Sequence, residues 1–266
     1  MSKHSDPSPP VPAPALRLRG RTFDAGRPAV MAIINRTPDS FYATAGPGEL
    51  DAAMAALHQA VADGADLVDV GGVRAGQVGA WVDANEEIAR VVPFLQAART
   101  AYPDLILSLD TWRSEVVEAV AGLGIDLIND TWAGHDPALV DSAAAMGAGV
   151  VVSHTGGVSP RTDPVEVSYG PDDDDVVTAV LTDLRQGAAR AVAAGIATES
   201  VLVDPTLDFG KTTRHSLRLL RATGQVAGLG FPVLQAISRK DVIGETLDLP
   251  ADERLEGSLA ATAVAS

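Results

Sequence analysis

The chain alternates between short apolar runs and longer stretches in which apolar residues recur at helical spacing. Each apolar run ends on or beside a polar residue, and the runs cover residues 30–35, 67–72, 105–110, 127–130, 150–154, 201–204 and 232–238. Helical spacing occurs at residues 52–63, 84–100, 114–122, 137–146, 176–194, 213–227 and 254–266. This regular alternation predicts a parallel sheet covered by helices. Residues 16–23 alternate apolar and polar before a turn at residues 24–26, which predicts a small hairpin ahead of the sheet.

A parallel barrel and a doubly wound open sheet both fit this alternation. The first predicted strand is not followed by a Gly-x-Gly-x-x-Gly motif, which disfavours a dinucleotide-binding sheet. Polar residues end nearly every strand, and a barrel brings the carboxyl ends of all strands to one mouth. We therefore predict a (β/α)8 TIM barrel with an N-terminal β-hairpin, formed by residues 16–266 after a disordered tail of residues 1–15. Seven strands follow the hairpin, so the eighth βα unit is expected to be absent from this chain.

The composition narrows the possible partners. The formal net charge is −15, which argues against nucleic acid or an anionic membrane surface as a partner. The chain has no cysteine, which excludes disulfides and thiolate chemistry, and no apolar stretch reaches the ~18–20 residues of a membrane span. These features favour a cytoplasmic protein. The acidic run at residues 172–175 fits a solvated helix N-terminus better than a metal site.

Short polar motifs follow the predicted strands. They are residues 35–41 (NRTPDSF), 69–72 (DVGG), 110–113 (DTWR), 128–130 (IND), 204–205 (DP), 209–211 (FGK), 238–240 (SRK) and 254–257 (RLEG). Together and in this order they resemble the motifs of dihydropteroate synthase and the wider pterin-binding barrel family, from about residue 20 to the end of the chain. The resemblance implies folate biosynthesis: condensation of a dihydropterin that carries a CH2-pyrophosphate group with p-aminobenzoate. It also implies Mg2+ as cofactor and a homodimer.

The resemblance assigns roles to individual residues at the strand ends. Asp110, Asn129 and Asp204 would accept hydrogen bonds from the N–H edge of the pterin, for which a carboxylate offers fork geometry. Lys240 would donate to the pterin ring and forms, with Asp110, the expected catalytic pair. The other expected site residues are Asn35 for the diphosphate and Mg2+, Ser238 and Arg239 for the carboxylate of the arylamine, and Phe209 and Arg74 elsewhere in the substrate pocket. Taken alone, Asp110 or Asp204 would more often be a helix N-cap.

Other segments depart from the family pattern. Residues 71–79 read GGVRAGQVG where the family has GGESTRPG, so the amine-binding loop lacks the hydroxyls, the acid and the proline. Thr206 and Asp208 replace two glycines of the segment that follows Asp204. These departures resemble a divergent second paralogue of actinobacteria. They leave three functions open: a synthase of weak or altered activity, a non-catalytic pterin-binding protein with a regulatory role, and the pterin module of a corrinoid methyltransferase.

Overall fold

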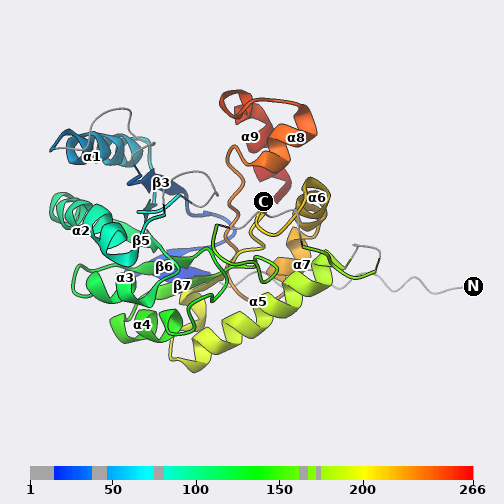
Figure 1. Ribbon diagram of the computed structural model, residues 1–266, viewed down its shortest axis with the longest axis horizontal. Helices are drawn as coiled ribbons and strands as arrows, with labels where there is room; N and C mark the ends of the chain where they lie inside the picture. The colour runs from blue at the N-terminus through cyan, green and yellow to red at the C-terminus, as the bar shows by residue number, and fades with distance from the viewer. Residues whose placement is uncertain (1–14, 38–46, 75–80, 162–166, 172–174, 266) are drawn as a thin grey trace, which may run out of the picture.

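The computed structural model describes residues 15–37, 47–74, 81–161, 167–171 and 175–265 (Figure 1). Its centre is a six-stranded sheet in which each strand pairs in parallel with the next one along the chain. In order these strands are β3 (Met31–Asn35), β4 (Leu67–Gly71), β5 (Ile106–Asp110), β6 (Leu127–Asp130), β7 (Gly149–Val152) and β8 (Val201–Val203). The parallel order confirms the predicted α/β class. All but one residue of the predicted tail lie outside the described residues.

The strand predicted at residues 232–238 is much shorter than expected. Only Val233 forms a parallel bridge, to Val203 of β8, supported by hydrogen bonds from Val203 N to Pro232 O and from Leu234 N to Val203 O. The rest of the segment takes an irregular path and carries its side chains along the inner face of the sheet. Residues on β3 and residues 234–238 line one cavity, so the sheet curls until its first and last members flank the same space.

Helices surround this curled sheet (Figure 1). They are α1 (Pro47–Ala62), α2 (Ala84–Ala101), α3 (Ser114–Ala119), α4 (Leu139–Met146), α5 (Val176–Ala193), α6 (Thr213–Arg221), α7 (Thr223–Ala227), α8 (Asp241–Leu247) and α9 (Leu255–Ala265). The helix predicted at residues 213–227 is divided at Ala222, and α8 was not predicted. Two single 3-10 turns, η2 (Thr198–Ser200) and η3 (Ala251–Glu253), complete the regular structure of the described residues.

Alternate residues of each strand face opposite sides of the sheet, and this alternation separates the core from the site. On β4, Val68 and Val70 are fully buried against the outer helices, in a cluster that includes Phe94 of α2 and Leu184 of α5. Asp69, which lies between those valines, faces the inside of the curl. The helices therefore bury the apolar alternate positions, and the inner positions are left to form a cavity.

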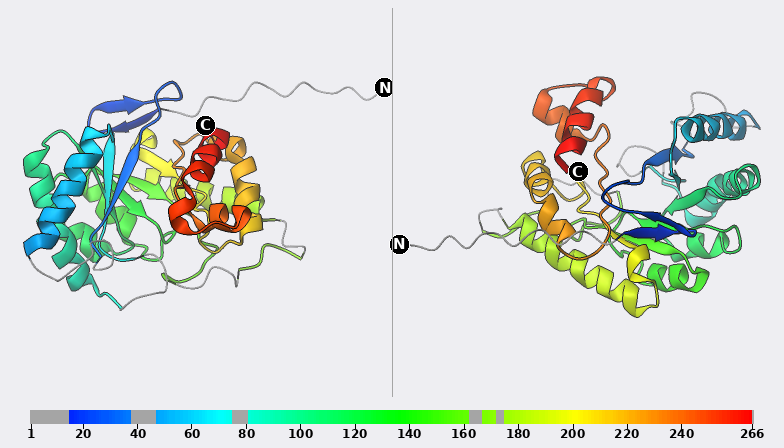
Figure 2. Two further views of the ribbon diagram at one scale, coloured as in Figure 1. Left: turned by 90° about the horizontal axis from the view of Figure 1, so that it is seen from above. Right: turned by 180° about the vertical axis from the view of Figure 1, so that it is seen from behind.

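The N-terminal hairpin closes the amino end of the strands. Strands β1 (Leu16–Leu18) and β2 (Arg21–Phe23) pair antiparallel, as predicted, and Arg19 and Gly20 turn the chain with positive φ angles of 48° and 71°. Leu16, Leu18 and Phe23 form one buried cluster with the inner residues at the starts of the strands, Leu67, Ile106 and Leu127 among them. Figure 2 shows the hairpin lying across the sheet at its back. The carboxyl ends of the strands are consequently the open end of the cavity.

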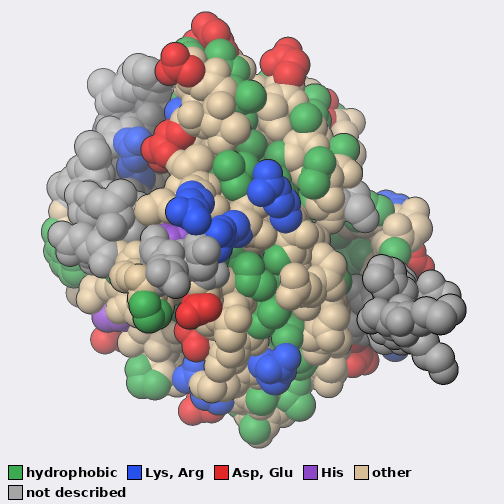
Figure 3. All heavy atoms as spheres, turned by 90° about the vertical axis from the view of Figure 1, so that its right-hand side faces the viewer, with side chains coloured by type: hydrophobic (Ala, Val, Ile, Leu, Met, Phe, Trp, Pro, Cys, Tyr) green, Lys and Arg blue, Asp and Glu red, His purple; other side chains and the backbone are tan. Residues whose placement is uncertain are grey.

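Basic side chains are not spread evenly over this acidic chain. Figure 3 views the molecule from the right-hand side of Figure 1, and Lys and Arg side chains gather near the middle of that face. Helix α6 lies on this side and carries Arg214, Arg218 and Arg221 at helical spacing. Among the described helices, none combines the length and the apolar character that crossing a membrane requires.

Candidate functional site

The inward positions of the strands build a cavity of about 670 Å3. Polar side chains reach it from the carboxyl halves of β3, β4, β5 and β6 and from the residue after β8, which are Asn35, Asp69, Asp110, Asn129 and Asp204. The lining also includes Met31, Ile33, Thr37, Val73, Arg74, Thr131, Thr206, Phe209, Leu234, Gln235, Ala236, Ile237, Ser238 and Lys240. The cavity thus has a wall of short polar groups and apolar surface on either side, which suits a small planar heterocycle.

The structure brings together all but one of the residues predicted for the site. Asn35, Arg74, Asp110, Asn129, Asp204, Phe209, Ser238 and Lys240 line the cavity. Arg239 is not among the lining residues: it is exposed, has a positive φ of 53°, and its backbone N–H donates to Ser258 Oγ on α9. Its two neighbours, Ser238 and Lys240, both line the cavity. The contact of Arg239 with an arylamine carboxylate stays a prediction.

Two buried carboxylates, Asp69 and Asp110, stand on adjacent strands in the wall of this cavity. Asp69 accepts hydrogen bonds from Ser108 Oγ at 2.5 Å and from Asn129 Nδ2 at 2.9 Å. Asp110 accepts from Thr131 Oγ1 at 2.9 Å. Burial raises the pKa of the Asp110 carboxyl well above its usual range, and the nearby charge of Asp69 raises it further. Hydrogen-bond donors of a bound ligand would stabilise the ionised form of Asp110 and oppose this rise.

Asp204 and Lys240 also line this cavity. Asp204 Oδ1 accepts the backbone N–H of Thr206 at 2.7 Å, and burial raises the pKa of its carboxyl against the opposing effect of Lys240. Lys240 Nζ donates to Leu207 O at 2.7 Å and lies 5.0 Å from the centre of the Phe209 ring. Burial lowers the pKa of the Lys240 ammonium. A cation beside an aromatic face and a carboxylate can position a flat polar ligand between them.

Thr206 and Asp208, which replace the family's glycines, keep a glycine-like backbone. Their φ angles are 54° and 72°, in the left-handed region that costs a side-chain-bearing residue roughly 1–2 kcal/mol. Hydrogen bonds offset this strain: Thr206 Oγ1 accepts from His154 N at 3.0 Å, and both oxygens of Asp208 accept from Val242 N at the start of α8. The loop therefore keeps its path, while the Thr206 side chain adds bulk to the cavity wall.

The residues at the cavity mouth offer little to a metal ion by themselves. Within the described part of the chain, no group of three or more His, Cys, Asp or Glu side chains could hold one. Asn35, the predicted Mg2+ ligand, ends β3 and contributes a single amide oxygen to the cavity. Mg2+ commonly keeps several waters and takes its other ligands from a few protein oxygens and substrate phosphates. These residues fit Mg2+ only as a companion of a bound diphosphate.

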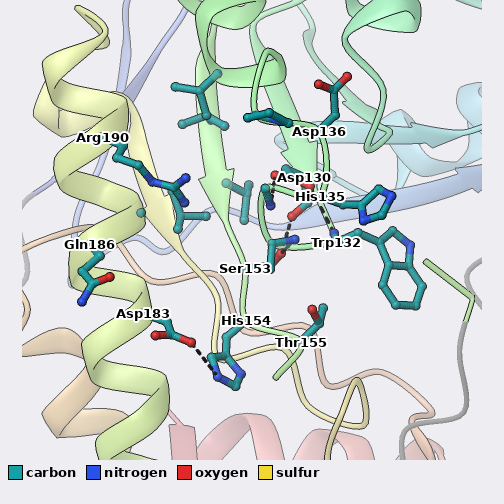
Figure 4. A pocket seen from close by; sticks show the side chains of 18 of the residues that line it. Asp130, Trp132, His135, Asp136, Ser153, His154, Thr155, Asp183, Gln186 and Arg190 are labelled. Atoms are coloured by element: carbon teal, nitrogen blue, oxygen red, sulfur yellow. Dashed lines mark hydrogen bonds and ion pairs between the residues drawn. The ribbon is translucent and has the colours of Figure 1, made fainter. Parts of the chain in front are cut away.

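A second cavity, of about 700 Å3, lies beside β6 and β7 and shares no described lining residue with the first (Figure 4). Asp130 faces it, because Asp130 follows Asn129 on β6 and so points the other way. Asp183 and Arg190 line its far side from α5, and His154 Nε2 lies 3.4 Å from Asp183 Oδ2. Burial lowers the pKa of His154 to about 3 and raises the pKa of Asp130 to about 6. Its polar strand-end groups come from β6 and β7 only, whereas the inner cavity takes such groups from β3, β4, β5, β6 and β8.

Comparison with known proteins decides the family. Residues 31–266 match the model of the family described as pterin binding enzyme. Over 249 residues the chain is 54% identical to the inactive dihydropteroate synthase 2 of Mycobacterium tuberculosis, covering 94% of this chain and 78% of that protein. The chain belongs to the dihydropteroate synthase family. The dihydropteroate synthase of Escherichia coli is 34% identical over 251 residues, covering 94% and 87% of the two chains.

Solved structures of dihydropteroate synthases have the same fold. The enzyme from Yersinia pestis with a sulfonamide drug superposes with a TM-score of 0.83 at 34% identity, covering 94% of this chain and 89% of that one. The enzyme from Xanthomonas albilineans with 4-aminobenzoic acid gives a TM-score of 0.81 at 34% identity, with coverages of 95% and 89%. The predicted TIM-barrel type of α/β fold is confirmed by this likeness.

The predicted site residues left out several polar residues of the wall, among them Asp69 and Thr206. Asp69 stands between apolar neighbours, and only the period of two along β4 could have shown that it faces inward with Leu67 and Gly71. Thr206 was noted as a departure from glycine, but its hydroxyl contact with His154, 52 residues earlier, depends on the fold.

Proposed function

We propose that this member of the dihydropteroate synthase family binds a dihydropterin in the inner cavity, with the N–H edge of the pterin on Asp110, Asn129 and Asp204. The observation that carries the proposal is the convergence of these groups with Lys240 in one cavity at the carboxyl ends of the strands. Each of these residues comes from a different strand end or loop. A role in stabilising the fold alone would not require all of them to face the same cavity. The cavity size, about 670 Å3, suits a small-molecule ligand.

The reaction proposed for this cavity is the condensation that the family catalyses, and its rate is proposed to be reduced or zero. In the condensation, the bond between the pterin CH2 carbon and the diphosphate oxygen breaks, and the amine nitrogen of p-aminobenzoate bonds to that carbon. The amine loses one proton, and pyrophosphate leaves. Lys240 and Asp110 would hold the pterin ring, and Asn35 would meet the diphosphate together with Mg2+.

Three features support weak or absent condensation. The amine-binding loop lacks its hydroxyls and proline in the sequence, and residues 75–80 of this loop lie outside the described residues. Thr206 adds a side chain to the wall where the family has glycine. The mycobacterial relatives that are 54% identical carry the name inactive dihydropteroate synthase 2. A non-catalytic pterin-binding role is the second candidate, and the synthase relatives disfavour the corrinoid methyltransferase module.

One assay separates the two candidates. The purified protein is mixed with dihydropterin pyrophosphate and Mg2+, and pyrophosphate release is followed with and without p-aminobenzoate, beside the E. coli synthase as a positive control. Release that depends on p-aminobenzoate supports the condensing enzyme. Calorimetric binding of the dihydropterin without such release supports the non-catalytic role. Absence of both binding and release contradicts the proposed function.

A further inference from the structure

Asp69 is a buried acid, and each of its carboxylate oxygens accepts a hydrogen bond from a side chain on a neighbouring part of the sheet. It is 3% exposed and lies between Val68 and Val70, which are fully buried. Oδ1 accepts from Ser108 Oγ on β5 and Oδ2 accepts from Asn129 Nδ2 on β6. One carboxylate therefore ties together three consecutive strands of the sheet across its concave face. A purely apolar residue would fill this position with less desolvation cost, so the acid needs another explanation.

The contact with Asn129 fixes which end of that amide turns away from Asp69. Asn129 Nδ2 donates to Asp69 Oδ2, so the NH2 group of the amide, and not its carbonyl oxygen, meets this carboxyl group. Burial raises the pKa of Asp69, and the hydrogen bonds from Ser108 and Asn129, which favour the ionised form, oppose that rise. The carbonyl oxygen, Oδ1, is buried and has no hydrogen-bond partner in the structure. Asn129 itself is 6% exposed and lines the inner cavity. The amide thus keeps an acceptor unsatisfied beside the place where a ligand would lie.

We propose that Asp69 is a positioning residue that locks the Asn129 amide with its carbonyl oxygen available to the ligand, and so selects ligands whose ring bears an amino group over those bearing a carbonyl at the same place. The inference rests on the proposed function, since it concerns the same cavity. Without Asp69, an asparagine amide can turn by 180° and present either a donor or an acceptor at little cost. With Asp69 in place, a turned amide would set the Asn129 oxygen against a carboxylate oxygen.

The surroundings of the pair do not supply a competing lock. Around Asp69 and Asn129, the cavity wall carries Asp110 and Thr131, which are hydrogen-bonded to each other, and Asp204, which is bonded to Thr206 N. The partner that fixes the amide orientation is therefore Asp69. Ser108 holds Asp69 from the other side and does not touch Asn129 in any hydrogen bond of the described residues. This difference makes Ser108→Ala a matched control for changes at Asp69.

The test uses two probes that differ at one ring substituent: 6-hydroxymethylpterin, with a 2-amino group, and 6-hydroxymethyllumazine, with a 2-oxo group. Affinities for both are measured by calorimetry for the wild type, Asp69→Asn, Asp69→Ser and Ser108→Ala, and folding is checked by circular dichroism. For the wild type we expect the pterin to bind about 10- to 100-fold more tightly, because the lumazine sets two acceptors against each other. In Asp69→Asn and Asp69→Ser this ratio is expected to fall at least about fivefold below the wild-type value, with Ser108→Ala retaining it. A residual preference for the pterin is expected in these variants, because Asp110 and Asp204 still accept from its N–H edge.

The outcomes separate this inference from the proposed function. A folded Asp69 variant that keeps the wild-type ratio overturns the positioning role while leaving pterin binding intact. A ratio that collapses equally in Ser108→Ala also overturns it, because the effect would then belong to the whole wall. A wild type that prefers the lumazine overturns it without any variant. If the wild type binds neither probe, the proposed function fails, and this inference fails with it.

Discussion

The most demanding stability prediction concerns Lys211, a lysine that is 2% exposed and joins two loops beside the cavity. Its Nζ donates to His154 O at 2.6 Å, to Thr206 O at 3.0 Å and to Phe209 O at 2.8 Å. Burial lowers the pKa of this ammonium to about 7. In Lys211→Met the apolar side chain keeps most of the volume, and the carbonyl oxygens lose their donor.

The magnitude follows from two opposing effects. Each buried acceptor left without a donor costs roughly 1–3 kcal/mol, and carbonyls tolerate this better than N–H groups, so about 1 kcal/mol each is the reasonable value. The three bonds then give a loss of about 3 kcal/mol, against which stands relief from burying a charge. For a chain of this size we expect the melting temperature to fall by about 6–12 °C.

Urea unfolding at pH 7 measures this change, with Arg221→Met as the control, because Arg221 is exposed at the end of α6. The control should stay within about 0.5 kcal/mol of the wild type. A Lys211→Met protein whose free energy of unfolding stays within about 1 kcal/mol of the wild-type value would contradict the expected loss of about 3 kcal/mol. It would show that burying the ammonium costs about as much as its bonds contribute.

Three further predictions concern pH, the loop after β8 and the amine site. Burial lowers the pKa of His154 to about 3, although the exposed Asp183 lies near it. The stability that depends on its neutral ring is therefore complete above about pH 6.5 and declines as the pH falls toward about 3, by at most about 1.4 kcal/mol per pH unit. Asp130, with a pKa raised to about 6, opposes this trend between about pH 6 and 4. The measurement is therefore a comparison of variants: from pH 7 to 5 the urea midpoint of His154→Gln should fall less than that of the wild type, and equal falls would contradict the prediction. Thr206→Gly relieves the positive φ but leaves His154 N without its acceptor, so we expect a net loss of about 1 kcal/mol in chemical denaturation, and a stabilised variant would refute this. Sulfamethoxazole with pyrophosphate should shift the melting temperature less than in the E. coli synthase, because residues 73–79 lack the hydroxyls and proline of the family loop; an equal shift would contradict the reasoning.

Much of the fold could be predicted because the spacing of apolar residues shows the helical or strand period clearly in the segments that are mostly buried. Strands β3 to β8 lie where apolar runs end on polar residues. Nearly all positions of β4 to β8 are buried, whereas β3 is partly exposed. Helix α8 escaped prediction because it has only seven residues, with Gly244 inside, and its first turn is capped by Asp208, 34 residues away from Val242. The division at Ala222 likewise has no local sequence cue.

The site was predictable where a residue's role follows from its strand end, and less so elsewhere. Asp110, Asn129 and Asp204 end or follow strands, and parallel strand ends must converge. The same reasoning could not show that Arg239 stays outside the cavity lining, because the left-handed backbone of this turn and its hydrogen bond to Ser258 Oγ on α9 depend on the fold. It also could not show that Asp69 restrains Asn129, since that contact joins strands two places apart in the sheet.

The most direct test of the central claim is calorimetry of a dihydropterin with the wild type and with Asn129→Ala and Asp204→Ala. Both residues line the inner cavity and each loses a ligand contact if a pterin binds there. We expect the wild type to bind with one site per chain and each variant to bind at least about tenfold more weakly, with a circular dichroism spectrum like that of the wild type. Gln186→Ala, which alters the outer cavity, should bind like the wild type. Undiminished affinity in both inner variants, or lost affinity in Gln186→Ala alone, would contradict the placement of the site in the inner cavity.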